Sequence, residues 1–400
     1  MDEAAARKNE VLVLNHISPA GLSQLPTERY AIVKASQSPD AILVRSHDLH
    51  GHPFGPNLKA IGRAGAGVNN IPVPELSARG VPVFNAPGAN ANAVKELVLA
   101  GMLLAARNLV PALEFVHNLK PGADDLERAV ESGKKQFAGV ELPGHTLGVI
   151  GLGKVGSMVA DAAIRLGMQV LGYDPEITVD AAWGLSSLVR RAGSIDEVLK
   201  ASHFVTLHVP LLDATRNLIG AHNIAHFRQG AVLLNFSREG VVDNGVVLNA
   251  LDAHRLKYYV SDFPSPELLG KQGVVALPHL GASSREAEEN SAVMVVNQLR
   301  DYLEDGNLRN SVNFPEAAMA RESPYRLAIA HANVPDMLAR ISHVLGSAGI
   351  NIHNMLNKSR ADMAYTLVDV DTGVRAQTLD ALRQIDGVLG VRYLPKQKKN

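Results

Sequence analysis

Residues 147–156 read Leu-Gly-Val-Ile-Gly-Leu-Gly-Lys-Val-Gly, and this stretch decides the fold. An apolar, strand-like run precedes its G-x-G-x-x-G pattern, and a segment with apolar residues at helical spacing follows it. Gly151 permits a tight turn, Gly153 lets a pyrophosphate approach the backbone, and Gly156 lets the helix pack closely on the strand. Free N–H groups at the start of that helix attract phosphate. The stretch therefore predicts a dinucleotide-binding unit.

The second strand of this unit ends in Tyr173-Asp174, and Asp174 lies 23 residues after Gly151. A carboxylate there can accept hydrogen bonds from the adenosine ribose and would repel a 2′-phosphate, so it favours NAD over NADP. The alternative interpretation is a glycine turn in an α/β protein without a cofactor. All parts of the pattern agree, which favours the NAD site.

The rest of the chain also alternates short β-branched segments with amphipathic ones, which is typical of doubly wound parallel sheets. Residues 118–144 are polar and predict a connection. Periodicity is lost over 306–324, which predicts a linker. Residues 325–400 follow the order strand-helix-strand-strand-helix-strand, which predicts a ferredoxin-like βαββαβ fold. We therefore expect an α/β protein with two Rossmann-like parallel-sheet domains and one small terminal domain.

The composition of the 400-residue chain excludes several classes of protein. Its 39 basic and 40 acidic residues give a net charge of −1, so neither nucleic acid nor an anionic membrane is an expected partner. It has no cysteine, which excludes a thiolate nucleophile. Because the N-terminus is polar and no apolar run could span a bilayer, we expect a cytoplasmic protein. Three histidines within 46–52 predict a solvated loop, and no metal is expected.

Three later segments carry side chains suited to alcohol oxidation: Arg238, Glu267 and His279, each beyond a predicted strand. The carboxyl ends of parallel strands form the ligand-binding edge of such a sheet, so we expect the three to meet there. Histidine is suited to take the hydroxyl proton near neutral pH, and a carboxylate can orient its ring. Arginine can hold a substrate carboxylate with a planar set of donors.

These segments resemble the D-isomer-specific 2-hydroxyacid dehydrogenases, in which Arg, Glu and His occur in this order. The resemblance implies that Arg238, Glu267 and His279 are catalytic. Family members often have the pattern Phe-Pro-x-Glu, whereas here Phe-Pro is followed by Ser265-Pro266-Glu267. Glu267 is still five residues past Asp262, as in the usual Asp-x-x-x-x-Glu pattern.

The same resemblance implies a discontinuous catalytic domain. The substrate domain would comprise 1–92 and 284–310, the NAD-binding Rossmann domain 93–283, the linker 311–324 and the terminal domain 325–400. The residues implied at the NAD site are Ala66, Gly151, Gly153, Lys154, Val155, Gly156, Asp174, His208, Val209, Pro210, Phe236, Ser237, Arg238, Asp262, His279, Gly281 and Ala282.

Two N-terminal segments, Ile42–Ser46 and Ile61–Asn70, resemble the phosphoglycerate dehydrogenase branch of this family. In that branch, arginines matching Arg45 and Arg63 approach the substrate phosphate. This implies oxidation of D-3-phosphoglycerate to 3-phosphohydroxypyruvate, the first step of L-serine biosynthesis, with NAD as hydride acceptor. The alternative is that each arginine forms a surface ion pair. The implied substrate contacts are Arg45, Ser46, Arg63, Ala64, Gly65, Arg238 and His279.

Residues 325–400 resemble an ACT domain, a small-molecule regulatory module. The resemblance implies that His331, Asn333 and Asn351 bind L-serine as an effector across a pair of domains, in a homodimer or homotetramer. Asp336 stands where the family usually has glycine, which adds a carboxylate near the expected effector. The alternative is a domain that only holds subunits together.

Two other functions stay open at this point. One is a related D-2-hydroxyacid dehydrogenase that reduces other 2-oxoacids, against which Arg45 and Arg63 count. The other is a non-catalytic regulatory protein that senses NAD, against which the intact Arg–Glu–His set counts. Turnover of NAD with D-3-phosphoglycerate would distinguish both from the favoured function.

Overall fold

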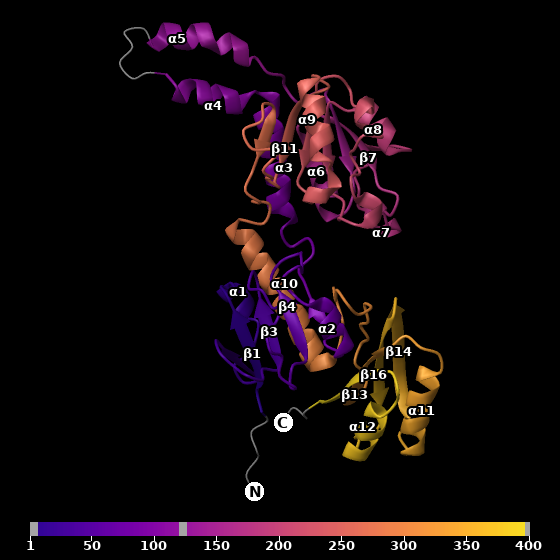
Figure 1. Ribbon diagram of the computed structural model, residues 1–400. Helices are drawn as coiled ribbons and strands as arrows, with labels where there is room; N and C mark the ends of the chain where they lie inside the picture. The colour runs from indigo at the N-terminus through magenta and orange to yellow at the C-terminus, as the bar shows by residue number, and fades with distance from the viewer. Residues whose placement is uncertain (1–6, 120–125, 397–400) are drawn as a thin grey trace. The chain divides into compact units, whose positions relative to one another are not determined.

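The computed structural model describes residues 7–119 and 126–396, and the chain divides into two compact units (Figure 1). The first unit comprises Met1–Asn90 and Arg285–Asn400, and the second comprises Ala91–Ser284. Within the described ranges, no single helix is long and apolar enough to cross a membrane. Helices α3 (Ala91–Ala106) and α4 (Leu109–His117), bent by 68° at their junction, pass that test only as a pair, by length and composition.

The second unit is built on a seven-stranded sheet with the order β12-β11-β10-β9-β6-β7-β8, in which all neighbours are parallel. Within this sheet, β6 is the first strand, and β7 and β8 extend the sheet from β6 to one edge. The chain then crosses back to β9 on the other side of β6, and β10, β11 and β12 complete the second half of the sheet. This is a doubly wound Rossmann sheet. Its strands are β6 (Thr146–Ile150), β7 (Gln169–Tyr173), β8 (Val189–Arg191), β9 (Phe204–Leu207), β10 (Ala231–Asn235), β11 (Leu256–Ser261) and β12 (Val274–Ala276).

Helices cover both faces of this sheet, which is why β6, β9 and β10 are buried along their whole length. On one face, α3 and α6 pack through residues such as Val98 and Val159. On the other face, α8 and α9 pack through Val198 and Val247. The covering helices are α6 (Lys154–Arg165), α7 (Val179–Trp183), α8 (Ile195–Ala201) and α9 (Asn244–Asp252), and short 3-10 turns lie at Asp213–Thr215, Ile224–His226 and Glu239–Val241.

The predicted connection, 118–144, contains a helix that the sequence analysis missed. Helices α4 and α5 (Leu126–Gly133), with a 3-10 turn at Lys134–Phe137, extend away from the sheet (Figure 1). The ring centroids of Phe115 in α4 and Phe137 in the 3-10 turn lie 5.4 Å apart, so these two elements pack against each other. Leu113, Val116 and Leu126 are exposed, so this extension has an uncovered apolar side in a single chain.

The first unit begins with a five-stranded parallel sheet in the order β2-β1-β3-β4-β5. Helix α1 packs on α10 so closely that a Cβ added at Gly21 would lie 2.7 Å from Ala292. The two parallel sheets confirm the predicted Rossmann-like fold class. The elements are β1 (Asn9–Leu14), α1 (Pro19–Leu22), β2 (Tyr30–Val33), β3 (Ala41–Val44), β4 (Ala60–Arg63), α2 (Val73–Ala78), β5 (Val83–Phe84) and α10 (Arg285–Asp305).

The C-terminal part of this unit is a four-stranded antiparallel sheet in the order β14-β15-β13-β16, with two helices packed on one face. This order and the βαββαβ succession are those of a ferredoxin-like fold, as predicted. The arrangement is consistent with an ACT-like domain. Its elements are β13 (Tyr325–Ala332), α11 (Met337–Ser347), β14 (Ile352–Arg360), β15 (Met363–Val370), α12 (Ala376–Arg383) and β16 (Val388–Pro395).

The other face of the C-terminal sheet packs on the end of α10. Ala328, Tyr365 and Leu367 share one core with Tyr302 and Phe314. Residues 311–324, predicted as a linker, form neither helix nor strand, and Phe314 within them is fully buried. The segment is therefore part of the packed core of this unit.

Side chains from the C-terminal sheet and from the segment before it cap the C-terminal end of α10. Each carbonyl oxygen from Tyr302 to Gly306 receives a side-chain hydrogen bond, which satisfies groups that a helix end leaves without partners. Three of the four donors are arginines, whose charge is favourable at this end of a helix. The donors are Arg392 to Tyr302 and Leu303 (2.8 and 2.9 Å), Arg321 to Glu304 (3.4 Å), Arg326 to Asp305 (3.1 Å) and the Tyr365 hydroxyl to Gly306 (2.7 Å).

Arg326 is fully buried, and its charge is balanced by Asp369, which is also fully buried. Arg326 Nε donates to Asp369 Oδ1 over 2.6 Å and Nη2 donates to Oδ2 over 2.9 Å. Burial alone would raise the pKa of Asp369. The hydrogen bonds from Arg326 and from the Glu322 N–H, together with the charges of Arg326 and Arg321, outweigh burial and lower the pKa.

Asp369→Asn should lower the free energy of unfolding by about 3–5 kcal/mol at neutral pH, because it leaves the Arg326 charge buried without a counter-ion. Denaturant unfolding measures this loss. Since the folded-state pKa of Asp369 is lowered, the ionised carboxylate stabilises the fold above the unfolded-state pKa of about 3.9. This stability is lost as the pH falls further, so the gap between wild type and variant should narrow below about pH 4.

Asp380→Asn is the matched control, since Asp380 forms an exposed pair with Arg383. It should change the free energy of unfolding by no more than about 1 kcal/mol. Equal losses for the two variants would contradict a special role for the buried pair.

Candidate active site

The glycine fingerprint lies in the turn between β6 and α6, and the two outer glycines are fixed by packing. Gly151 has a φ of +90°, in the left-handed region that glycine adopts without strain. A Cβ added at Gly156 would lie 1.9 Å from the carbonyl oxygen of Gly151, so no larger residue fits there. A Cβ added at Gly153 would have no atom of the described chain within 4 Å. The middle glycine therefore borders open space at the helix N-terminus, as a pyrophosphate site requires.

Asp174 is held at the end of β7 by two backbone N–H groups. Leu152 N donates to Asp174 Oδ2 over 2.8 Å, and Glu176 N donates to Oδ1 over 3.0 Å. The carboxylate thus links the second strand to the glycine turn. A pocket of about 580 Å³ lies beside it, lined among others by Leu152, Asp174, Pro175 and Gly193.

His208 follows β9, at the point where the order of the strands reverses. A Cβ added at Gly151 would lie 2.7 Å from the His208 carbonyl oxygen, so this loop borders the glycine turn. Burial lowers the pKa of His208 to about 3, and the ring is neutral at physiological pH. Its Nε2 lies 2.9 Å from Thr206 Oγ1. His208 therefore offers a neutral hydrogen-bonding ring to this edge of the sheet.

Asn235, which the sequence analysis did not single out, orders the segment that carries Arg238. It is fully buried at the end of β10, and its Nδ2 donates to the Arg238 carbonyl over 2.9 Å. Its Oδ1 accepts hydrogen bonds from the backbone N–H and the hydroxyl of Ser237. Arg238 itself is exposed, and its Nη1 donates to the Ser237 carbonyl over 2.7 Å.

Asp262, at the end of β11, holds the loop that carries His279. Its carboxylate accepts hydrogen bonds from Leu280 N over 2.7 Å and Gly281 N over 2.8 Å. Burial raises the pKa of Asp262, and these two hydrogen bonds offset only part of the rise. His279 has a φ of +57°, and its ring lies 5.0 Å from that of Phe263. Asp262 thus positions the histidine loop through its backbone.

Arg238, Glu267 and His279 therefore follow three neighbouring strands, β10, β11 and β12, at their carboxyl ends. Glu267 and His279 are both exposed, and no hydrogen bond joins them in the part of the chain that the structure describes. Catalytic hydrogen bonds are often long without substrate and tighten in the complex. The fold thus places the three residues beyond the carboxyl ends of neighbouring strands, at the same edge of the sheet.

The first unit joins the two predicted phosphate arginines to each other. Val44 pairs with Arg63 across β3 and β4, and Arg63 Nε donates to the carbonyl of Arg45 over 3.1 Å. The same Nε donates to Asn70 Oδ1 over 3.1 Å. Arg45 forms an ion pair with Glu288 of α10, at 2.7 Å, and both side chains are about one-third exposed (35% and 34%). Sequence patterns gave no signal for Glu288, because its pairing depends on tertiary packing.

The three predicted effector residues lie at opposite ends of the C-terminal sheet. His331 pairs with Ala364 of β15, and the carbonyl of Asn351 accepts from the N–H of Asp371, seven residues further along. Seven residues of strand span about 24 Å. His331 is buried, which lowers its pKa, while Asn333 is exposed. One chain therefore does not bring the three residues together.

The backbone conformation of Asp336 explains why the family that this domain resembles usually has glycine at this position. Its φ is +66°, in the left-handed region, which aspartate tolerates better than most residues. Its carboxylate lies 3.4 Å from Arg340 on the next turn of α11. The added negative charge thus has a partner within the same helix.

Comparisons with known proteins agree with this geometry. The model of the D-isomer specific 2-hydroxyacid dehydrogenase, NAD binding domain, matches residues 100–281. The D-3-phosphoglycerate dehydrogenase of Haemophilus influenzae is 34% identical over 351 residues, which is 85% of this chain and 82% of that protein. The enzyme of the same name from Escherichia coli is 32% identical over 351 residues, which is 84% of this chain and 82% of that protein.

Solved structures share the fold. An NAD⁺-bound 3-phosphoglycerate dehydrogenase from Entamoeba histolytica has a TM-score of 0.59 at 23% identity, over 77% of this chain and 99% of that one. The D-mandelate dehydrogenase of Rhodotorula graminis has a TM-score of 0.64 at 20% identity, over 78% and 98%. The solved structures show the same fold, and the bacterial relatives and the match of the NAD-binding domain show the family. The chain belongs to the D-isomer specific 2-hydroxyacid dehydrogenases.

Proposed function

We propose that this chain oxidises D-3-phosphoglycerate to 3-phosphohydroxypyruvate with NAD, the first step of L-serine biosynthesis. The observation that carries the proposal is the joined pair Arg45 and Arg63 at the ends of β3 and β4, beside the glycine-rich loop 65–67. Two guanidinium groups suit a phosphate dianion, and backbone N–H groups of the loop suit a carboxylate. The names of the bacterial relatives support the same substrate.

His279 acts as the base that takes the proton from the substrate hydroxyl, and Glu267 orients its ring and stabilises the imidazolium. Arg238 holds the substrate carboxylate and polarises the oxygen on the reacting carbon. Gly153, with open space around it, and Asp174 fit the pyrophosphate and the adenosine ribose of NAD. When bound, NAD accepts the hydride from the substrate.

His279→Ala and Glu267→Gln should each lower kcat by roughly 10²–10⁴, the usual contribution of a positioned acid–base group. Steady-state kinetics with D-3-phosphoglycerate measures the loss, and fluorescence titration should find the affinity for NADH nearly unchanged. The exposed His222 is the matched control, and His222→Ala should keep the wild-type rate. Wild-type turnover in either site variant would refute the assigned roles.

Asp174→Asn should weaken NAD binding about tenfold, because it removes the charged acceptor for the ribose hydroxyls. It should also raise the ratio of kcat/KM for NADP to that for NAD, since the charge that repels a 2′-phosphate is lost. Asp180→Asn, which changes an exposed carboxylate on α7, is the control and should leave the ratio unchanged. An unchanged ratio in Asp174→Asn would count against the NAD assignment of this residue.

Arg45→Ala and Arg63→Ala should each lower kcat/KM for D-3-phosphoglycerate by roughly one to two decades, because a charge-assisted hydrogen bond contributes about 1.5–3 kcal/mol. Activity on an unphosphorylated D-2-hydroxy acid should fall far less. Glu288→Gln should act in the opposite direction and lower KM for phosphoglycerate, because it frees Arg45 from its ion pair. Equal losses on both kinds of substrate would mean that the arginines only support the fold.

L-serine should inhibit the enzyme if two C-terminal domains pair along β14, since antiparallel pairing of two copies brings His331 and Asn333 of one near Asn351 of the other. We therefore propose a homodimer or homotetramer with an effector site at this pairing. Asn351→Ala should remove inhibition and keep the basal rate, and Gln377→Ala on the exposed side of α12 should change neither. An enzyme that neither binds serine in calorimetry nor is inhibited by it would disprove this regulation.

A further inference from the structure

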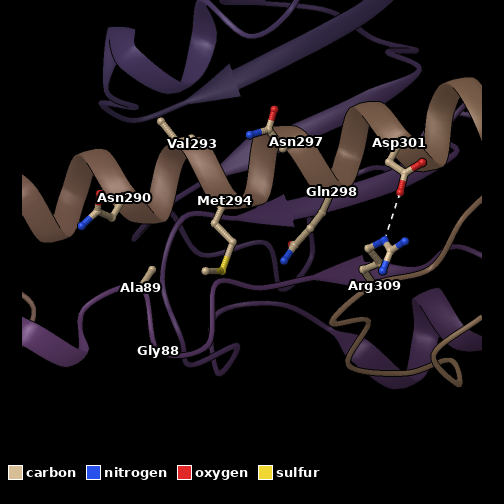
Figure 2. Close-up of a pocket in the computed structure, with 9 residues that line it drawn as sticks. All are labelled: Gly88, Ala89, Asn290, Val293, Met294, Asn297, Gln298, Asp301 and Arg309. Atoms are coloured by element: carbon tan, nitrogen blue, oxygen red, sulfur yellow. Dashed lines mark hydrogen bonds and ion pairs between the residues drawn. The ribbon is translucent and has the colours of Figure 1, made fainter. Parts of the chain in front are cut away.

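A pocket of about 600 Å³ lies between the side of α10 and the loop of Gly88 and Ala89 (Figure 2). Its volume is in the range of sites that bind small molecules. All of its lining residues belong to the first unit, and they are different from the residues assigned above to substrate, cofactor and effector.

Gln298 of α10 is one of the residues that line this pocket, and its buried amide has no hydrogen-bond partner among the described residues. The residue is 7% exposed, and both Nε2 and Oε1 are buried without a hydrogen-bond partner among residues 7–119 and 126–396. Figure 2 shows its side chain extending to the same side of the helix as Met294, toward the loop of Ala89. Buried polar groups are almost always paired, so an amide with two open positions indicates a missing partner.

The charges at the pocket balance each other. Arg309 Nε lies 3.4 Å from Asp301 Oδ2, and Asn307 Nδ2 donates to Asp301 Oδ1 over 2.8 Å. The remaining lining is apolar or neutral, with Ala89, Val293 and Met294 on the walls. A ligand with a net charge would find no uncompensated counter-charge here, so the pocket favours an uncharged molecule.

The Gln298 amide determines which hydrogen-bonding groups the ligand must carry. A carboxamide presents a donor and an acceptor side by side, and it pairs with a planar edge that carries an acceptor next to a donor. Primary carboxamides and the amino edge of adenine have this pattern. The thioether of Met294 makes favourable contacts with an aromatic ring.

We propose that this pocket binds a small uncharged molecule with a carboxamide or aminopurine edge, which pairs with the Gln298 amide. Gly88 and Ala89 directly precede the first crossing of the chain between the units, after Asn90, and Asn290 closely follows the second crossing, before Arg285. The bound molecule therefore touches the segments next to both crossings. A molecule bound there would contact the first unit close to the points where the chain enters and leaves it, away from the residues assigned to the reaction.

Isothermal titration calorimetry of the full chain tests the proposal, with NADH at saturation so that the cofactor site is filled. The probes are benzamide and 9-methyladenine, each with a matched uncharged ligand that lacks the donor: methyl benzoate and 9-methylpurine. One of the two probes should bind at millimolar concentration or below, and its matched ligand should bind at least about tenfold more weakly. The probe that binds identifies the carboxamide or the aminopurine as the class.

Gln298→Leu removes the amide at nearly constant volume and should weaken binding of that probe at least about tenfold. Gln377→Leu, at an exposed amide of α12, should leave it unchanged. If Gln298→Leu does not fold, Ala89→Leu fills the pocket and should cause the same loss with the amide in place. Absence of binding by both probes, or equal binding by wild type and pocket variants, would overturn the proposal. Turnover is not needed for any of these measurements, so their outcome is separate from that of the proposed reaction.

Discussion

The contact between Gly156 and the Gly151 carbonyl is the constraint on which the second unit depends. A Cβ at Gly156 would lie 1.9 Å from that oxygen, so helix α6 can start against β6 only with glycine there. This fixes the helix N-terminus over the central strand, and Asp174 ties the neighbouring strand to the same turn. The cofactor edge of the sheet is thus determined by a few backbone contacts near its middle strand.

The side chains assigned to catalysis are less directly fixed, and each depends on a buried polar neighbour. Asn235 holds the backbone around Arg238, and Asp262 holds the loop of His279. Each neighbour can matter without touching a substrate, because it sets the conformation of a segment that the proposal assigns to the substrate site. Rigid strand ends with exposed functional side chains are a common solution in sheets of this topology.

Sequence reasoning succeeded where the signal is local. The glycine spacing, the acid after the second strand and the order of elements in the last 76 residues each follow from nearby residues and predicted the observed topology. It could not find the ion pair of Arg45 with Glu288, because those residues meet only after α10 packs on the first sheet. It also took residues 311–324 for a linker, since their buried side chains, such as Phe314, follow no helical or strand period.

Helix α10 carries a consequence beyond its role as a scaffold. It is a single α-helix of 21 residues, about 30 Å long, that begins six residues after His279 and ends in the arginine cap from the C-terminal sheet. Its buried residues Ala292, Val295 and Leu299 share one core with Leu43 of the parallel sheet and Ala328 of the C-terminal sheet. The same helix thus completes the cores of both sheets of the first unit, so a substitution on its buried face would loosen the parallel sheet and the C-terminal sheet together.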